Sequence, residues 1–189
     1  KILSKHEKFY QQIAEYAKEL SPFGCRIPLS KKQNYGFGAP AHGIYLSPWA
    51  TCVLERLGLP LYFGNTENGA VFLDDYSVDR FEDEEISDFM KGVVILSAVA
   101  AEKLNARGFE ADIGVLVRPW KGVGINGEFV EGKRIAAQYA LQELVPIREN
   151  IEVLSESYYH NAESQKDIPV FPAVTKCKNT QGGETIVFC

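Results

Sequence analysis

Two residues of this chain, Ser97 and His160, have side chains that suit hydrolytic chemistry. A serine hydroxyl becomes a nucleophile when a histidine takes its proton and an acid orients that histidine. Ser97 directly follows the apolar run Val93–Leu96, and the segment after His160 carries Glu163 and Asp167 as possible orienting acids. A Ser-His hydrolase is therefore one hypothesis for this chain.

The residues around Ser97 favour a structural role for its hydroxyl. Val93–Leu96 predicts a strand buried on both faces, and the alanine-rich segment that follows predicts a helix ending at Gly108. Serine is a preferred residue before the first turn of a helix, and glycine suits the left-handed residue after the last turn. The glycines that frame a nucleophile in a strained strand-to-helix turn are missing here. We therefore predict that Ser97 caps the helix and that this turn holds no catalytic residue.

A second set of polar residues follows another predicted strand. Asp74 and Asp75 come directly after the apolar run 70–73. In open α/β sheets, ligands bind beyond the carboxyl ends of the strands, so a crevice near Asp74 and Ser97 is a candidate binding site for a small molecule. The alternative for both aspartates is that they cap the turn after the strand.

His42 and Trp120 complete the candidate binding residues. His42 lies in the glycine- and aromatic-rich segment 34–43, whose glycine spacing fits neither a dinucleotide-binding motif nor a phosphate-binding loop. Trp120 is a candidate for contact with a partner protein or for stacking on a sugar ring, as are Tyr35, Phe37 and Trp49. Ordinary core packing is the alternative for each of these aromatic residues.

Composition and cysteine spacing exclude several classes of function. The formal net charge of −5 gives no basic surface for nucleic acid, and no apolar run is long enough to cross a bilayer. No signal peptide is visible, and the compartment stays open between cytoplasm and periplasm. The cysteines lie too far apart in sequence for a metal motif, so we expect no metal and no cofactor; they are Cys25, Cys52, Cys177 and Cys189. A Cys177–Cys189 bridge remains open.

The elements that must position these residues alternate between helix and strand. With 189 residues, of which 46% are hydrophobic, the chain can form one domain with a substantial core. Periodicity predicts helices over 4–20, from 48 to 57, and from Asp83, where the acidic cluster Glu82–Glu85 suits a helix start. Strands are expected over 59–63, 70–74, 93–96 and 111–117. This alternation predicts a mainly parallel sheet with helices on both faces.

The last third of the chain has a different pattern. Residues 118–150 are glycine-rich and predict an irregular, β-rich insertion with a short hairpin, followed by a strand over 151–155 and a polar loop over 160–167. Residues 172–177 and 184–188 predict two antiparallel strands joined by a turn at Gly182-Gly183.

These elements carry a family resemblance. The passage from Ala50 to Phe63, the acidic-start helix leading into Gly92–Leu96, and the closing Pro172-Ala173 with Gly182-Gly183 together resemble the class I glutamine amidotransferase-like α/β domain. The similar version is the one that accompanies β-galactosidase-type glycoside hydrolases, and trehalose-utilisation-type domains are also similar. The resemblance implies a flavodoxin-like, three-layer sandwich.

The chain departs from that family at the centre of the predicted sheet. A working class I amidotransferase needs a cysteine at the turn where this chain has Ser97, so we expect amidotransferase chemistry to be lost. The resemblance and the abrupt ends of the sequence predict a non-catalytic accessory or oligomerisation domain within a longer, carbohydrate-active enzyme. The expected partners are a catalytic domain of the same protein, another copy of the chain, and carbohydrate.

Overall fold

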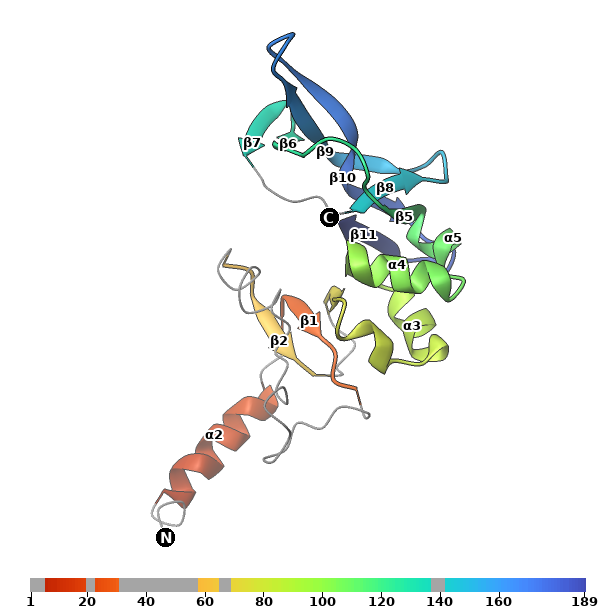
Figure 1. Ribbon diagram of the computed structural model, residues 1–189. Coiled ribbons are helices and arrows are strands. Elements are labelled where there is room, and N and C mark those ends of the chain that lie inside the picture. The colour runs from red at the N-terminus through yellow and green to blue at the C-terminus, as the bar shows by residue number, and fades with distance from the viewer. Residues whose placement is uncertain (1–5, 20–22, 31–57, 65–68, 137–141) are drawn as a thin grey trace, which may run out of the picture.

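The computed structural model describes residues 6–19, 23–30, 58–64, 69–136 and 142–189 (Figure 1). These residues form an α/β structure with one large mixed sheet and a separate two-stranded sheet. The α/β class predicted from the sequence is thereby confirmed.

The large sheet has a parallel half and an antiparallel half. Within the described residues its order is β2 (Leu61–Phe63), β1 (Cys25–Ile27), β3 (Val71–Leu73), β4 (Val93–Ser97), β11 (Glu184–Phe188), β10 (Lys166–Lys178), β9 (Glu152–Asn161), β6 (Gly127–Val130) and β7 (Lys133–Ala136). Neighbours from β2 to β11 pair in parallel, and neighbours from β11 to β7 pair antiparallel. The prediction of a mainly parallel sheet therefore holds for the first half only.

Three described helices follow the strands of the parallel half: α3 (Asp83–Met90), α4 (Ala98–Ala106) and the short α5 (Glu110–Ile113). α3 begins with a capping box, in which the Glu82 N–H donates to Glu85 Oε2 at 3.0 Å. The predicted structural role of the acidic cluster is thus confirmed. A 3-10 turn, η2 (Val78–Arg80), lies between β3 and α3.

The predicted strand over 111–117 is wrong in its first half. Residues up to Ile113 belong to α5, Gly114 ends that helix with φ of 79°, and β5 (Val115–Pro119) starts only afterwards. β5 leaves the large sheet and pairs antiparallel with β8 (Gln142–Pro146). A short apolar run such as this one suits a buried helix turn as well as a strand, so its periodicity does not decide between them.

The main core lies between the helices and one face of the parallel strands. Alternate residues of β3 and β4 point to this face, where they meet Ile86 and Met90 of α3 and Leu104 of α4. The opposite face carries a smaller cluster around Ile27 and Phe72. The helix expected over 48–57 lies outside the described residues, so the three-layer sandwich stays a prediction.

The antiparallel half confirms one predicted hairpin and corrects another segment. β10 and β11 pair antiparallel, with Val174 opposite Phe188. The polar stretch expected as a loop over 160–167 is a turn only at 162–165, because its ends belong to β9 and β10, where His160 pairs with Asp167. Polar side chains on the solvent face of an antiparallel ribbon hide its strand character from a hydrophobic pattern. β6 joins this half by pairing with β9, and β7 pairs with β6, so part of the 118–150 segment belongs to the sheet.

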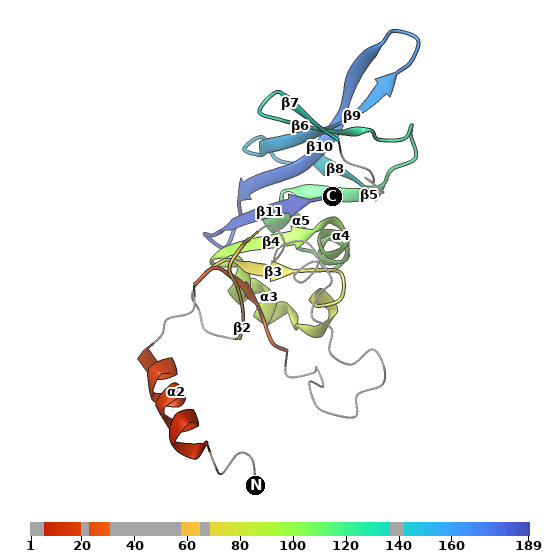
Figure 2. The ribbon, with the colours of Figure 1, turned by 90° about the vertical axis from the view of Figure 1, so that its left-hand side faces the viewer.

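The helix near the start of the chain is confirmed as α2 (Glu7–Glu19). It lies apart from the sheet and from the other helices in both views (Figures 1 and 2). No helix in the described ranges is long and apolar enough to cross a membrane.

The cysteines of the C-terminal hairpin do not form the bridge that the sequence left open. Cys177 pairs with Thr185, and Cys189 lies four residues further along β11, roughly 13 Å away at 3.3 Å per residue. Cys25, Cys177 and Cys189 are free thiols, whereas Cys52 lies outside the described residues.

Burial should make the free thiols a source of alkaline instability. It raises the pKa of Cys189 from 9.0 to about 12 and that of Cys25 to about 11. The folded chain then holds thiol protons that the unfolded chain releases above pH 9, so stability is full below pH 9 and is lost as pH rises toward 12. Urea unfolding at pH 8 and pH 10.5 should show a smaller loss for Cys189→Ser than for the wild type. Equal losses for the two proteins would contradict this expectation.

Candidate functional site

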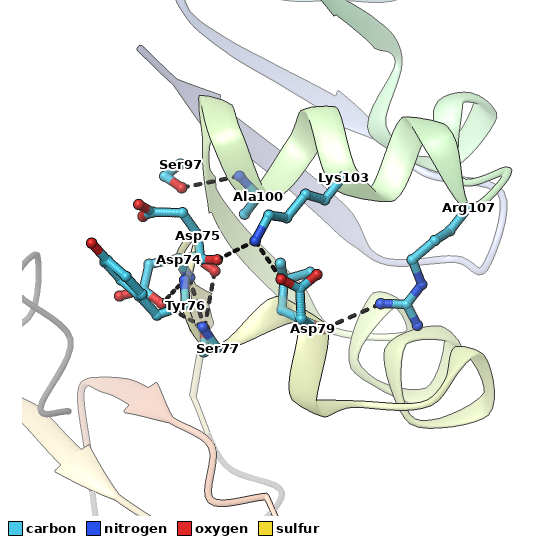
Figure 3. Close-up of polar contacts among 10 residues, drawn as sticks. Asp74, Asp75, Tyr76, Ser77, Asp79, Ser97, Ala100, Lys103 and Arg107 are labelled. Atoms are coloured by element: carbon cyan, nitrogen blue, oxygen red, sulfur yellow. Dashed lines mark hydrogen bonds and ion pairs between the residues drawn. The ribbon is translucent and has the colours of Figure 1, made fainter. Parts of the chain in front are cut away.

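Among the described residues, a cluster of polar contacts lies at the carboxyl ends of β3 and β4 (Figure 3). Leu73 pairs with Leu96, so the next residue of each strand, Asp74 and Ser97, comes at the same edge of the sheet. This is the edge where open α/β sheets bind ligands. The two candidate residues that the sequence placed near one crevice are thus positioned by adjacent strands.

Ser97 connects β4 to α4. Its side chain is buried, its backbone is extended with φ of −67° and ψ of 155°, and its Oγ accepts the Ala100 N–H at 3.2 Å. The hydroxyl therefore satisfies one of the free N–H groups at the start of α4. The predicted capping role of Ser97 is confirmed.

Asp74 caps the turn after β3. Its Oδ1 accepts the N–H groups of Tyr76 and Ser77 at 3.1 and 2.8 Å, and its own N–H donates to Ser77 Oγ at 2.9 Å. Asp74 is only 1% exposed, and its other oxygen, Oδ2, is buried without a hydrogen-bond partner. An acceptor left unpaired in this way costs about 1–3 kcal/mol. Capping accounts for one oxygen of this carboxylate and leaves the other unexplained.

Asp75, the next residue, also has a carboxylate oxygen without a hydrogen-bond partner. The residue is half-buried, and its Oδ1 has no hydrogen-bond partner. Its main-chain carbonyl accepts a hydrogen bond from Lys103 Nζ of α4 at 2.6 Å, and the same ammonium contacts Asp79 Oδ2. The lysine therefore anchors the segment after β3 without contacting the Asp75 carboxylate.

Arg107, the residue directly after α4, holds the same segment. Its guanidinium donates to the Val78 carbonyl at 3.1 Å, to the Phe81 carbonyl at 2.9 Å, and to Asp83 Oδ1. Sequence reasoning missed Lys103 and Arg107. Their spacing of four residues on a predicted helix, together with the acidic stretch 74–85, was the signal that could have found them.

The structure does not bring Ser97 and His160 together. His160 Nδ1 lies 2.8 Å from Asp167 Oδ1, so one of the proposed orienting acids does contact the histidine. Ser97, however, pairs with Phe188, which pairs with Val174, seven residues from Asp167 along β10. At 3.3 Å per residue this separates the hydroxyl from the imidazole by roughly 20 Å. The Ser-His hydrolase hypothesis thus lacks the contact that it requires.

The His160–Asp167 pair contacts residues of the antiparallel strands and not Ser97. Asp167 Oδ2 also contacts Arg134 Nε of β7 at 3.1 Å, and Arg134 donates to the Tyr158 hydroxyl at 3.3 Å. The other named acid, Glu163, contributes its N–H to Asn161 Oδ1 in the hairpin turn. This arrangement ties the β6–β7 hairpin to the β9–β10 hairpin.

Trp120 lies on the antiparallel half of the structure. It is half-buried, its Nε1 donates to the Val123 carbonyl at 2.7 Å, and its ring packs on Phe171 with centroids 4.9 Å apart. These contacts are those of the core-packing alternative. His42 lies outside the described residues, as do Tyr35, Phe37 and Trp49.

Comparison with known proteins gives one weak structural likeness. No family model matches the chain, and no curated protein matches it. The structure of Gan42B, a GH42 β-galactosidase, is similar with a TM-score of 0.45 and 12% sequence identity. The likeness covers 95% of this chain and 30% of that enzyme, so the chain spans less than a third of its length. A likeness at this level does not assign the chain to a family.

Proposed function

We propose that this chain is an accessory α/β domain of a carbohydrate-active enzyme and that it acts by contact with other protein surfaces. The observation that carries the contact role is the apolar face of α2. Phe9, Ile13 and Tyr16 recur at helical spacing, and they are 56%, 49% and 74% exposed. An amphipathic helix normally buries such a stripe, so this face is suited to docking in a groove of a partner.

The partners that we propose for this face are a catalytic domain of the same protein or a second copy of the chain. The resemblance of Pro172-Ala173 and Gly182-Gly183 to the closing segment of β-galactosidase-associated domains supports the carbohydrate context. The cap role of Ser97 supports a role without chemistry at the turn, because its Oγ accepts the Ala100 N–H and no histidine of the described residues hydrogen-bonds to it.

Photo-crosslinking in the native protein tests the docking face. A photoreactive phenylalanine at Tyr16 is expected to crosslink to peptides of a glycoside-hydrolase catalytic domain or of a second copy. The matched control places the same probe at Ala14, an exposed residue on the other side of α2, where we expect no such product. Equal yields at the two positions, or products from unrelated proteins alone, would overturn the proposal.

The same face should control the affinity of the association. The triple variant Phe9→Gln, Ile13→Gln, Tyr16→Gln removes the anchors while keeping residues that favour helix. We expect association to weaken about 100-fold, since a few apolar anchors carry most of the energy of an interface. Sedimentation velocity of the native assembly gives the measurement, with Ala14→Gln on the other side of α2 as control. An unchanged dissociation constant in the triple variant would contradict the role of α2.

A further inference from the structure

We infer that a cavity at the amino ends of β3 and β4 binds a small organic carboxylate, with Arg26 as the residue that pairs with it. This binding site lies at the edge of the sheet opposite to Asp74 and Ser97. It goes beyond the proposed contact role and does not depend on the α2 face.

The cavity has a volume of about 500 Å³. Its lining includes Gly69 and Gly92, which lie just before β3 and β4, together with Arg26 of β1, Val71 of β3 and Phe89 of α3. Pockets for small molecules typically have about 300–1,000 Å³ and combine apolar walls with a few well-placed polar groups. This cavity has the size and the mixed lining of such a pocket.

Arg26 places a positive charge between the sheet and α3. It is in register with Val71, a residue of the core between the strands and the helices, so its side chain projects toward the same layer. Arg26 is 7% exposed and borders the cavity, and its guanidinium carbon lies 5.3 Å from the centre of the Phe89 ring. Stacking on a ring uses the flat face of a guanidinium, whereas its five N–H donors lie in the plane. A carboxylate can therefore bind Arg26 in addition to the contacts that this residue has within the chain.

The charges at the cavity select an anion. Arg26 and Lys91 each contribute one positive charge and Asp88 contributes one negative charge, so the lining has a net charge of +1 in a chain whose formal net charge is −5. Lys91 and Asp88 form an exposed ion pair, with Nζ 2.6 Å from Oδ1. Two cations disfavour a cationic ligand, whereas a carboxylate can accept two N–H groups of a guanidinium at once.

The end of α3 presents little opposition to an anion. The last carbonyl groups of a helix carry partial negative charge. Here the Phe89 carbonyl accepts the Gly92 N–H at 3.1 Å, and the Met90 carbonyl accepts Asn179 Nδ2 at 2.7 Å. The Lys91 ammonium adds a full positive charge at the same end of the helix.

Val71 and Phe89 favour an organic carboxylate over an inorganic anion. Val71 is 3% exposed and belongs to the main core, and Phe89 packs against that core. Phosphate would leave these apolar side chains in contact with water, whereas a ring or a short alkyl chain beside the carboxylate would cover them. The ligand that fits is thus a carboxylate with a small apolar body.

Calorimetric titration of the chain tests this site with benzoate, butyrate, phosphate and uncharged benzamide as probes. We expect saturable binding of benzoate or butyrate, and weaker binding of phosphate and benzamide. Arg26→Lys keeps the charge but loses the paired donors, so it should raise the Kd of the bound carboxylate at least tenfold. Lys91→Gln removes an exposed charge and should raise that Kd about threefold.

Two further variants separate this site from general effects. Asp88→Asn removes the negative charge beside Lys91 and should lower the Kd about threefold, a gain in affinity that a misfolded protein would not show. Lys166→Gln removes the same charge as Lys91→Gln, but from an exposed residue of the β9–β10 hairpin, and it should leave the Kd unchanged.

Thermal unfolding without ligand checks that each variant is folded. The inference is overturned if neither carboxylate binds saturably, if phosphate or benzamide binds as tightly as the carboxylates, if Asp88→Asn does not tighten binding, or if Lys166→Gln weakens binding as much as Lys91→Gln does. Loss of the α2 face leaves this titration unaffected, so failure here and failure of the docking proposal are distinguishable.

Discussion

Replacing Asn179 by alanine should lower the free energy of unfolding by about 3 kcal/mol. This buried side chain lies in the turn between β10 and β11, where its Nδ2 donates to the Met90 carbonyl at 2.7 Å and to Thr185 Oγ1 at 3.3 Å. Its Oδ1 accepts the N–H groups of Gln181 and Gly183 at 3.1 and 2.9 Å. Truncation leaves several of these groups buried without a partner, and each costs about 1–3 kcal/mol.

Asn161→Ala is the matched control for this effect. Asn161 also holds a hairpin turn, since its Oδ1 accepts the N–H groups of Glu163 and Ser164 at 3.0 Å each. Those groups are exposed, so water can replace the lost acceptor, and we expect a loss of about 1 kcal/mol or less. Urea unfolding measures both variants. Similar losses would show that the Asn179 contacts to α3 do not stabilise the fold as argued.

Gly183→Ala should be at least as damaging, at about 3 kcal/mol or more. A Cβ at this position would lie 2.0 Å from the Gly92 carbonyl oxygen and 2.4 Å from that of Met90. Both are backbone atoms, so no side-chain rotation relieves the overlap, and the turn must move away from the end of α3. The Glu184 N–H that donates to Gly92 at 2.9 Å would be displaced with it.

The adjacent Gly182 separates this packing effect from backbone strain. It has a φ of +95°, but a Cβ there would meet no atom within 4 Å. Gly182→Ala therefore carries only the conformational penalty of a left-handed residue, about 1–2 kcal/mol. Thermal unfolding of the two variants should rank Gly183→Ala as the less stable. The reverse order would show that the close approach to α3 is unimportant.

The turn from β4 to α4 could be predicted because its signals are local. An apolar run, a serine cap before α4 and a glycine two residues after its end all lie within 93–108, so no distant contact had to be known. The same holds for the β10–β11 hairpin, whose strands flank Gly182-Gly183. The capped start of α3 is a third local signal that the structure confirms.

The errors lie where distant contacts decide the structure. Residues 111–113 became helix rather than strand because β5 pairs with β8, about 30 residues later, and not with the large sheet. The ends of the 160–167 segment became strand because β9 and β10 continue their pairing past the apolar part of the hairpin, and only 162–165 form the turn. Neither partner is visible in a window of local sequence.

The candidate site was predictable in place but not in detail. The end of a buried strand indicated Asp74, and the capped helix indicated Ser97 at the same edge. Which oxygen of Asp74 keeps a donor, and which does not, depends on the path of the following turn and on the reach of Lys103 across 28 residues. That information arises only once α4 is docked on the sheet.

The position of β11 has a consequence for the order in which the molecule can assemble. This strand lies between β4 and β10, so it joins the parallel half of the sheet to the antiparallel half, and it pairs Thr185 with Val94 across about 90 residues of chain. During synthesis on the ribosome, the strands up to β4 must wait with one edge unprotected until β11 arrives. Such a delayed, long-range closure slows folding and exposes an intermediate to aggregation and chaperone capture.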